Sequence, residues 1–467
     1  MFFFIIFAAQ KKWFMKVSNE RAGFSSGIGA VAAAAGSAIG LGNIWRFPYT
    51  AGQNGGGAFL ILYIIFVFLI GMPIMMSELM VGRRSQRNVV GAYRVLAPKH
   101  KAWQSVGWLA IVGVFLIYSF YSVVAGWTIN YIVASVSGQL GSLPPDQMGT
   151  AFEQFTSHAW HPLIFQLIMV VLTAGVITFG VQKGIEKCSK ILMPVLFLLL
   201  ILLCVRSLTL SGASRGVEFL FKPDFSKING GSVLSALGQA LFSLSLGMGT
   251  MVTYGSYIRK QDNLMKTSYS IVSADTLIAI LAGVAIFPAV FALGGSPTDG
   301  PSLVYVVLPK VFNSMPMGNL FAVLFFLLLA IAALTSTISL LEVMVSWGEE
   351  ELRMSRRTAT IFFTAVIFVI GAFCSLSFGP LNDFKIFGLT IFELLDKLTA
   401  TYLMPIGAFA LTLFVGWYCT KQDLRDELTN GGKLKGSYFN VWYFFVRYIA
   451  PVVLLGIIIA GSLGFEF

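Results

Sequence analysis

Two glycine-rich segments interrupt stretches that are otherwise apolar enough to form membrane helices, and they offer the chain's best setting for chemistry. The first runs from Gly36 to Asn43 (GSAIGLGN) and the second from Ser243 to Thr250 (SLSLGMGT). Glycine lowers helix stability by about 1 kcal/mol per residue, and unpaired backbone within a membrane is tolerated only around a cavity or buried site. The pattern therefore predicts ligand binding at mid-membrane. Close helix packing of the GxxxG kind, which Gly36 and Gly40 also satisfy, is the alternative.

Residues suited to enzyme chemistry are scarce. The three histidines form no HExxH or Cys/His cluster, and the four cysteines lie far apart without metal-ligand spacing. No nucleophile elbow, Walker or dinucleotide-binding fingerprint occurs in a suitable strand and helix context. The cysteines are therefore interpreted as small buried hydrophobic residues, and we expect no enzyme activity.

The composition indicates a membrane protein. Only 11% of the 467 residues are charged, 57% are hydrophobic, and the mean hydropathy is +0.80, whereas charged residues make up about a quarter of soluble domains. The formal net charge of +11 comes from short basic clusters between apolar runs. These clusters indicate membrane topology rather than nucleic-acid binding.

The chain has eleven apolar runs of spanning length, since a membrane helix needs about 20 residues. They lie near residues 27–47, 57–81, 105–136, 163–181, 187–207, 233–257, 269–294, 319–347, 358–378, 392–418 and 439–462. Most basic residues fall on one side of these spans, which places the N-terminus in the cytoplasm and the C-terminus outside.

The interrupted runs are the first and the sixth, which predicts two five-helix units that each open with a broken helix. This layout is typical of inverted-repeat transporters. The expected organisation is a cytoplasmic segment 1–26, a first repeat 27–207, an extracellular loop 208–232, a second repeat 233–418, and a cytoplasmic loop with the eleventh helix over 419–467.

Several motifs along the chain resemble those of the neurotransmitter:sodium symporters, especially the bacterial amino-acid transporters. They are AGSAIGLGNIWRFP at 35–48, NGGGAF at 54–59, PIMMSELMVGR at 73–83, Gly247, LTST at 334–337 and NGG at 430–432. The resemblance covers nearly the whole chain and implies an all-α fold like that of the bacterial leucine transporter. Better-known members have twelve spans, and this chain stops after eleven, as some bacterial members do.

The resemblance implies two sodium sites. Sodium is a hard cation that needs oxygen ligands, which unwound backbone and nearby Ser, Thr or Asn side chains supply. The first site would use the Ala38 carbonyl and the side chains of Asn43, Ser243 and Asp275. The second would use the carbonyls of Gly36, Ile39 and Ala332 with the hydroxyls of Thr335 and Ser336. Without the resemblance, Thr335 and Ser336 would be interpreted as interhelical hydrogen-bonding residues.

Asp275 departs from the chloride-dependent relatives. They have a neutral Asn at this position and a Ser one turn on, where this chain has Ala279. A carboxylate in the bilayer is costly and usually functional. A fixed negative charge beside the first sodium would replace bound chloride, so we expect chloride-independent transport, with Asp275 protonated on the empty return step.

The resemblance also implies a substrate class. Monoamine carriers have an Asp where this chain has Gly40, and amino-acid carriers have Gly, which leaves space for a carboxylate. The implied lining is apolar and uncharged, which favours a neutral hydrophobic or aromatic amino acid. The substrate-binding residues would be Ser37, Ala38, Gly40, Leu41, Gly42, Ile117, Tyr121, Phe242, Ser243, Ser245, Met248, Ser336 and Leu340.

Charged residues beside the site resemble the gates of the family. Arg46 would pair with Asp396 on the extracellular side, and Arg21 would pair with Glu350, near Tyr257, on the cytoplasmic side. Ion pairs in wetted vestibules form and break at little net cost. Two other buried carboxylates, Glu78 and Glu342, are expected to satisfy unwound backbone or a neighbouring span.

The main interpretation is a sodium-coupled transporter of the plasma membrane that imports a neutral amino acid by alternating access, without chloride or nucleic-acid partners. A non-transporting sensor of the same fold is the alternative. A channel is not favoured, because rings of carbonyls or carboxylates are not evident. The sequence leaves the oligomeric state open.

Overall fold

The computed structural model describes residues 23–292, 294–297 and 303–463, and within these ranges the chain is helical with no β-strand. The α-helices are α2 Gly27–Ala38, α3 Phe47–Gln53, α4 Gly57–Phe66, α5 Met72–Ser85, α6 Val89–Leu96, α7 Gln104–Val136, α8 Gln139–Ser142, α9 Met148–Ser157, α10 His161–Thr178, α11 Lys187–Leu208, α12 Ala213–Phe221, α13 Gly230–Ser243, α14 Thr250–Gly255, α15 Leu264–Ala292, α16 Leu308–Asn313, α17 Gly318–Glu351, α18 Arg356–Leu376, α19 Ile391–Lys397, α20 Met404–Leu413, α21 Lys421–Leu428, α22 Phe439–Phe444 and α23 Ala450–Ser462.

Short turns of other helical types join several of these helices. The wide π-helical turns are η1 Gly42–Arg46, η2 Val67–Gly71, η5 Val181–Glu186, η7 Leu303–Val307, η8 Leu398–Leu403, η9 Phe414–Tyr418 and η10 Phe445–Ile449. The 3-10 turns are η3 Lys101–Trp103, η4 Pro145–Gln147 and η6 Phe225–Lys227.

Nine helices of the described residues are long and apolar enough to cross a membrane, and the bent pair formed by Gly27–Ala38 and Gly42–Gln53 makes a tenth. The predicted sixth span corresponds to α13 and α14, of 14 and 6 residues. Neither piece alone has the roughly 20 residues that a crossing needs. The multi-pass helical fold is therefore confirmed, and the count of eleven depends on treating both broken helices as single spans.

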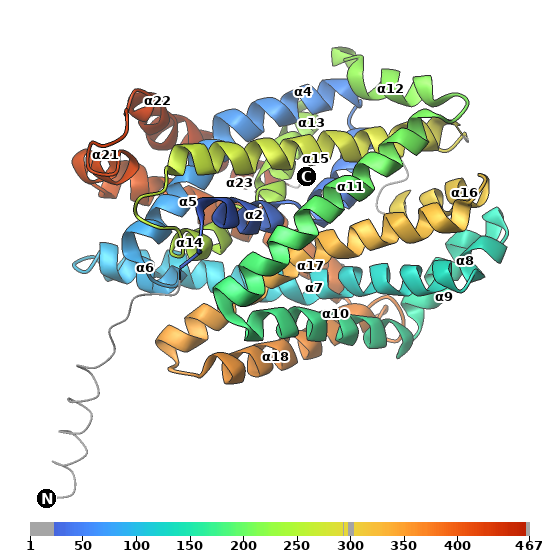
Figure 1. The fold of residues 1–467 in the computed structure, drawn as a ribbon, viewed down its shortest axis with the longest axis horizontal. Coiled ribbons are helices and arrows are strands. Elements are labelled where there is room, and N and C mark those ends of the chain that lie inside the picture. Colours follow the sequence, from blue (N-terminus) through green and yellow to red (C-terminus); the bar gives the residue numbers. More distant parts are fainter. Residues whose placement is uncertain (1–22, 293, 298–302, 464–467) are drawn as a thin grey trace, which may run out of the picture.

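The two broken helices lie inside the bundle. Helix α2 packs against α15, α11 and α17, while α13 packs against α4, and the long helices α7 and α17 pack against each other. Figure 1 shows α2 in the middle of the molecule, with α21 and α22 at one end and α8, α9 and α16 at the other. This arrangement surrounds the helix breaks with protein, as unpaired backbone at membrane depth requires.

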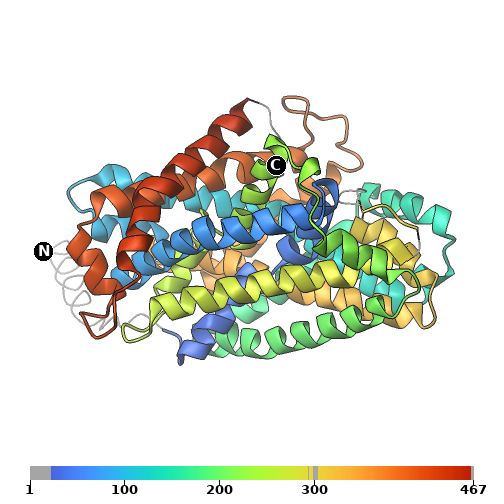
Figure 2. The same cartoon turned by 90° about the horizontal axis from the view of Figure 1, so that it is seen from above.

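The periphery of the bundle is apolar. Large hydrophobic side chains on α10, α11, α18 and α23 are at least half exposed, among them Val171, Leu198, Ile361 and Val452. Figure 2 shows α11 along one edge of the molecule and the last span, coloured red, along the opposite edge. An exposed apolar surface of this kind matches lipid tails rather than water.

Candidate functional site

The first helix break exposes backbone groups at the centre of the bundle. Helix α2 ends at Ala38, and the next residue, Ile39, has extended backbone with φ −73° and ψ 101°. The chain then bends by 47° into the second half of the span. Two side chains bind the freed amides: the Gly40 N–H donates to Asn43 Oδ1 at 3.1 Å, and the Leu41 N–H donates to the Tyr121 hydroxyl at 3.0 Å. The predicted interruption is therefore present.

The second break, between α13 and α14, depends on left-handed backbone. Ser245, Gly247 and Gly249 have φ of 54°, 80° and 75°, a region that glycine adopts without steric cost. The buried Glu78 carboxylate accepts a hydrogen bond from the Gly247 N–H at 2.7 Å. A Cβ on Gly247 would lie 2.1 Å from the Met404 carbonyl oxygen. Glu78 thus satisfies unwound backbone, as predicted.

Four oxygen-bearing side chains converge between the two breaks. Asn43 Nδ2 donates to Asp275 Oδ1 at 2.8 Å and to Ser243 Oγ at 2.9 Å. The Ser243 hydroxyl lies 2.9 Å from Asp275 Oδ2, and the Tyr63 hydroxyl donates to the same oxygen at 3.1 Å. All four residues are at most 1% exposed. The three side chains predicted for the first sodium site lie together, and Tyr63 is a fourth member that the sequence did not single out.

A second oxygen cluster joins α17 to the first break. The Thr335 hydroxyl lies 3.0 Å from the Ala332 carbonyl oxygen and 3.5 Å from that of Ile39. The Ser336 hydroxyl lies 3.4 Å from the Ser37 carbonyl oxygen. Hydroxyls and carbonyl oxygens of this kind suit a hard cation.

A small cavity of about 30 Å³ lies between the two breaks, α7 and α17, and it has room for only about two water molecules. Its lining carries no charged side chain. The lining residues are Ala38, Gly40, Gly42, Ile117, Tyr121, Phe242, Ser245, Met248, Ser336, Ser339 and Leu340.

Most of the predicted substrate-binding residues line this cavity, but Ser37, Leu41 and Ser243 do not. The backbone carbonyl of Ser37 accepts a hydrogen bond from the Ser245 hydroxyl at 3.0 Å. Ser339 lines the cavity and was not predicted, although it lies one helical turn after Ser336 on the same face of α17.

Gly40 lines the cavity at a point that has no room for a side chain. A Cβ at this position would lie 2.2 Å from Ser336 Oγ and 2.9 Å from the Tyr121 hydroxyl. Any side chain at position 40 would therefore displace both hydroxyls and fill the space beside the Leu41 amide.

The predicted extracellular gate residues line a second, larger cavity. Arg46 and Asp396 both face a space of about 450 Å³, together with Tyr49 and Trp127. The Arg46 guanidinium lies 4.4 Å from the centre of the Phe242 ring, and Phe242 also lines the small cavity below. Phe242 and Arg46 thus separate the two spaces.

The predicted cytoplasmic pair cannot be described, because Arg21 lies outside the described residues. Its expected partner Glu350 accepts hydrogen bonds from the backbone N–H of Asn88 at 3.0 Å and from its side chain at 2.9 Å. Asn88 is the N-cap of α6, so Glu350 helps to anchor the start of that helix.

The sequence missed a buried charge cluster that includes Tyr257, a residue of the predicted cytoplasmic gate. The Tyr257 hydroxyl donates to Glu342 at 2.6 Å, and Arg356 forms an ion pair with the same carboxylate. Arg356 also pairs with Glu349 at 3.0 Å. Glu342 is 0% exposed, so this cluster closes the space between α14, α17 and α18. Glu342 thus contacts neighbouring spans, as predicted, but its partner Arg356 was not foreseen.

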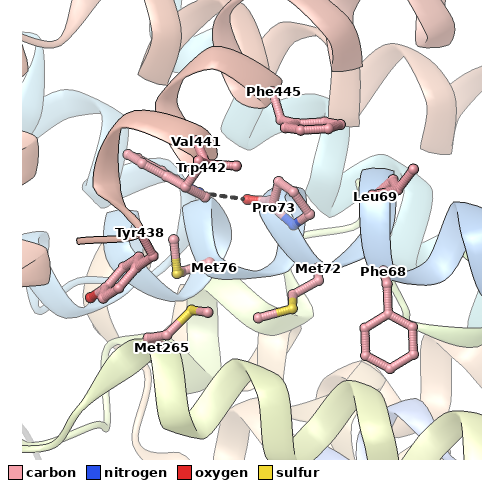
Figure 3. A pocket seen from close by; sticks show the side chains of 10 residues that line it. All are labelled: Phe68, Leu69, Met72, Pro73, Met76, Met265, Tyr438, Val441, Trp442 and Phe445. Atoms are coloured by element: carbon pink, nitrogen blue, oxygen red, sulfur yellow. Dashed lines mark hydrogen bonds between the residues drawn. The ribbon is translucent and has the colours of Figure 1, made fainter. Parts of the chain in front are cut away.

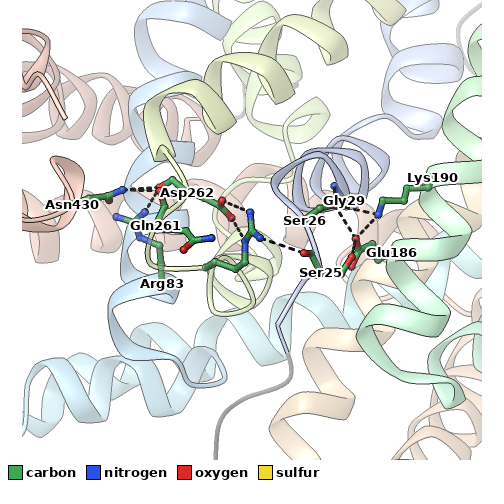
Figure 4. Close-up of polar contacts among 10 residues, drawn as sticks. Ser25, Ser26, Gly29, Arg83, Glu186, Lys190, Gln261, Asp262 and Asn430 are labelled. Atoms are coloured by element: carbon green, nitrogen blue, oxygen red, sulfur yellow. Dashed lines mark hydrogen bonds and ion pairs between the residues drawn. The ribbon is translucent and has the colours of Figure 1, made fainter. Parts of the chain in front are cut away.

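The start of α2 is held by a second set of polar contacts (Figure 4). Glu186 accepts hydrogen bonds from the backbone N–H of Ser25 at 2.7 Å and from its hydroxyl at 2.6 Å, and Lys190 pairs with the same carboxylate at 2.6 Å. A Cβ on Gly29 would lie 1.9 Å from Glu186 Oε1. Glu186, in the turn before α11, therefore fixes the N-terminal end of the first broken helix.

The segment after α14 is connected by polar contacts to the end of α5 and to the segment after α21. Arg259 pairs with Asp262 at 2.7 Å, and the Asp262 carbonyl oxygen accepts hydrogen bonds from Arg83 at 2.6 Å and Asn430 at 3.3 Å (Figure 4). The side chain of Arg83 is only 1% exposed. These contacts join the ends of α5 and α21 to the loop between α14 and α15.

An apolar pocket of about 160 Å³ lies between α5, the start of α15 and the start of the last span (Figure 3). It is lined by methionine and aromatic side chains of α5, α15 and α22, with Trp442 Nε1 donating to the Pro73 carbonyl oxygen at 3.2 Å. The pocket contains no charged side chain and is separate from the oxygen clusters, so it is not part of the candidate site.

Comparison with known proteins identifies relatives over nearly the whole chain. The model of the family described as "Sodium:neurotransmitter symporter family" matches residues 21–147 and 146–466. The "Uncharacterized sodium-dependent transporter YhdH" of Bacillus subtilis (strain 168) is 43% identical over 432 residues, which are 92% of this chain and 96% of that protein. An uncharacterized sodium-dependent transporter of Haemophilus influenzae is 35% identical over 454 residues, 95% of this chain and 99% of that protein.

A solved structure is also similar. The crystal structure of MhsT in complex with L-phenylalanine matches with a TM-score of 0.88 and 43% sequence identity, over 94% of this chain and 100% of that chain.

Proposed function

Because this chain belongs to the sodium:neurotransmitter symporter family, a family of sodium-dependent transporters rather than enzymes, we propose that it imports a neutral hydrophobic or aromatic amino acid together with sodium. The observation that carries this proposal is the uncharged cavity between the two helix breaks, with Gly40 against Tyr121 and Ser336. An acidic or basic substrate side chain would be buried there without a partner. The L-phenylalanine in the MhsT structure supports an aromatic substrate.

The substrate's carboxylate and ammonium groups would bind to unwound backbone. The Leu41 amide donates to Tyr121 in this structure, and it would be shared with the carboxylate at the N-terminal end of the second half-helix, where the helix dipole is positive. The ammonium would bind the carbonyls of Ala38 and Phe242 with the Ser245 hydroxyl. The cavity of about 30 Å³ is smaller than such a substrate, so Phe242 and Met248 must move when it binds. Methionine is flexible enough to do so.

We place two sodium ions beside the substrate. The first would lie among Asn43, Ser243 and Asp275, whose side chains lie within hydrogen-bonding distance of one another. The second would lie between Thr335, Ser336 and the carbonyls of Gly36, Ile39 and Ala332, of which Thr335 already approaches two. The first set provides neutral oxygen ligands and one carboxylate, and the second provides neutral oxygen ligands only; both kinds suit a hard cation such as sodium.

Asp275 supports transport without chloride. Its carboxylate is fully buried and accepts hydrogen bonds from Asn43, Ser243 and Tyr63, but it has no basic partner among the described residues. A buried carboxylate is expensive unless a cation balances it. Bound sodium would supply that cation, and the carboxylate would supply the negative charge that chloride provides elsewhere.

Alternating access would use the two sides of the site. Arg46, Asp396 and Phe242 would close the extracellular path, while the Glu342 and Glu186 clusters would close the cytoplasmic path until the first broken helix moves. We further propose that the N-terminus lies in the cytoplasm of the cell and the C-terminus outside, and that residues 27–207 and 233–418 form the two inverted repeats.

Proteoliposomes containing the purified protein test the substrate class. Uptake of labelled L-phenylalanine, driven by a sodium gradient, should be inhibited by neutral aromatic and branched amino acids and not by lysine or glutamate. Inhibition by lysine or glutamate as strong as that by tryptophan would refute the proposed class. Sodium-dependent binding without uptake or counterflow would instead support a sensor of the same fold.

A further inference from the structure

A group of basic and aromatic side chains lies where the last span meets the helix before it. Helix α21 places Lys421 over the ring of Tyr443, with Nζ 5.4 Å from the ring centre, and Arg425 over Phe439 at 6.0 Å. Phe439 and Tyr443 are stacked at 5.8 Å. Phe439 and Tyr443 are four residues apart on one helix and therefore lie on the same face of it. The two cations of α21 thus lie along that face of the last span.

Arg447 extends this face by one further turn, into the last span. Its guanidinium lies 4.6 Å from the centre of the Trp417 ring and 5.6 Å from that of Tyr443, and it donates a hydrogen bond to the Tyr443 hydroxyl. Its Nε is buried without a hydrogen-bond partner among the described residues. An arginine within a span is costly, so its remaining donors need an acceptor.

No carboxylate among the described residues forms an ion pair with Lys421, Arg425 or Arg447. The acidic residues of α21 have other partners: Asp423 pairs with Arg84 at 2.8 Å, Glu427 pairs with Arg83 at 2.6 Å, and Asp426 accepts a hydrogen bond from Gln422 at 3.0 Å. The hydrogen bond from Arg84 also lowers the pKa of Asp423. Two of the three acidic residues of α21 thus pair with arginines of α5, and the helix leaves two cations over the last span.

The location of the three cations indicates the kind of anion that they could bind. Arg447 follows Phe439, where the last helical segment begins, by eight residues, which is a rise of about 12 Å. Side chains on a helix lean toward its N-terminus, and Arg447 does so by stacking on Tyr443. Trp417 and Tyr448 beside it are 58% and 47% exposed on the outside of the bundle, as is typical of aromatic residues at a membrane interface. In the proposed orientation, a phosphate of the headgroup layer would lie at this level, next to the lipid tails.

We propose that Lys421, Arg425 and Arg447 bind the phosphate of an anionic phospholipid in the cytoplasmic leaflet, with Trp417 and Tyr443 against the lipid. This site is distinct from the transport site and uses the proposed orientation, in which the last span enters the membrane from the cytoplasm. Lys421 Nζ and Arg447 Cζ lie 5.4 and 5.6 Å from the centre of the same Tyr443 ring, so both long side chains would turn toward one phosphate bound beside that ring. Bound lipid would fix α21 to the end of the last span.

Native mass spectrometry of the full-length protein tests this site with phosphatidylglycerol and phosphatidylcholine of identical acyl chains. The double substitution Lys421→Gln with Arg447→Gln should lower the affinity for phosphatidylglycerol about 25-fold, because each cation near a membrane surface contributes about fivefold. Binding of phosphatidylcholine should stay unchanged. The matched control, Lys433→Gln with Lys435→Gln, removes two exposed cytoplasmic charges outside the site and should change the affinity less than about twofold.

Three results would overturn the proposal. They are equal binding of the two lipids by the unsubstituted protein, an equal loss in the control variant, and displacement of the lipid by excess inorganic phosphate, which would indicate a site for free anions. If the double variant does not fold, Lys421→Gln alone remains informative, because this side chain is exposed and has no ion-pair partner among the described residues. It should weaken phosphatidylglycerol binding about fivefold, and no change would refute the site. Since lipid binding is measured without transport, its failure is distinct from failure of the proposed transport function.

Discussion

Replacing Asp275 with asparagine tests whether the chain carries its own negative charge beside the first sodium. Asp275 is 0% exposed, and its carboxylate lies 2.8 Å from Asn43 Nδ2 and 2.9 Å from Ser243 Oγ. The substituted amide would keep the size of the side chain and much of its hydrogen bonding but remove the charge. The variant therefore separates the electrostatic role of Asp275 from a packing role.

The size of the effect follows from this geometry. Asp275 belongs to the proposed first sodium site and contacts its other two side chains, Asn43 and Ser243, directly, so a sodium ion bound there would lie close to the Asp275 carboxylate. Opposite unit charges about 4 Å apart attract each other by about 4 kcal/mol at an effective dielectric constant of about 20, or about a thousandfold in affinity. Rearrangement of the surrounding hydrogen bonds will reduce this effect, so we expect sodium affinity to fall at least tenfold.

The assay is sodium-dependent binding of labelled L-phenylalanine to the purified protein, measured in chloride and in gluconate. In gluconate, the Asp275→Asn variant should need an at least tenfold higher sodium concentration for half-maximal binding of L-phenylalanine. Adding Ala279→Ser, one turn further along α15, should restore affinity in chloride but not in gluconate. Thr276→Val is the control, because its hydroxyl bonds the Val272 carbonyl oxygen of its own helix at 2.8 Å. An unchanged sodium requirement of Asp275→Asn in gluconate would refute the electrostatic role.

Three further substitutions test other parts of the site. Asn43→Ala should weaken sodium and substrate binding together, since Asn43 contacts both Ser243 and Asp275; unchanged apparent affinities for both would contradict the first sodium site. Gly40→Ala should abolish L-phenylalanine binding while the protein stays folded, because the new methyl group would lie 2.2 Å from Ser336 Oγ; binding at normal affinity would show that the substrate lies elsewhere. Glu342→Gln should lower the free energy of unfolding by about 3–5 kcal/mol, because it leaves the largely buried Arg356 without its main partner, whereas Glu349→Gln, whose side chain is 34% exposed, should cost about 1 kcal/mol or less. Equal melting temperatures for these two variants would argue against the buried cluster.

The helix breaks could be predicted from the sequence because glycine weakens a helix locally, wherever the chain goes next. The same argument identified Gly247 as part of the second break and predicted that its freed backbone N–H needs a buried acceptor, which Glu78 provides. The apolar runs likewise indicated the spanning helices, since their length must match the membrane. The resemblance carried by the motifs at the first break predicted that Asn43 and Ser243 share a sodium site. In the structure, Asn43 Nδ2 lies 2.9 Å from Ser243 Oγ.

Contacts between distant segments were harder to predict. Tyr257 and Glu342 are 85 positions apart, and nothing in the local pattern of either segment indicates the other. The proximity of Arg447 to Trp417 depends on how the last two spans pack, which hydropathy does not determine. Tyr63 was missed because a tyrosine in an apolar run is interpreted as packing until a carboxylate is found at its hydroxyl. Ser339, in contrast, could have been found from its helical spacing to Ser336.

The most direct test of sodium-coupled amino-acid transport is the uptake of labelled L-phenylalanine into proteoliposomes under an inward sodium gradient. The same vesicles with potassium in place of sodium, and vesicles containing the Asn43→Ala variant, serve as controls. We expect accumulation above the external concentration only with sodium and the unsubstituted protein, and collapse of the accumulated label when a sodium ionophore is added. Uptake that is equally fast and equally concentrative in potassium would contradict the account.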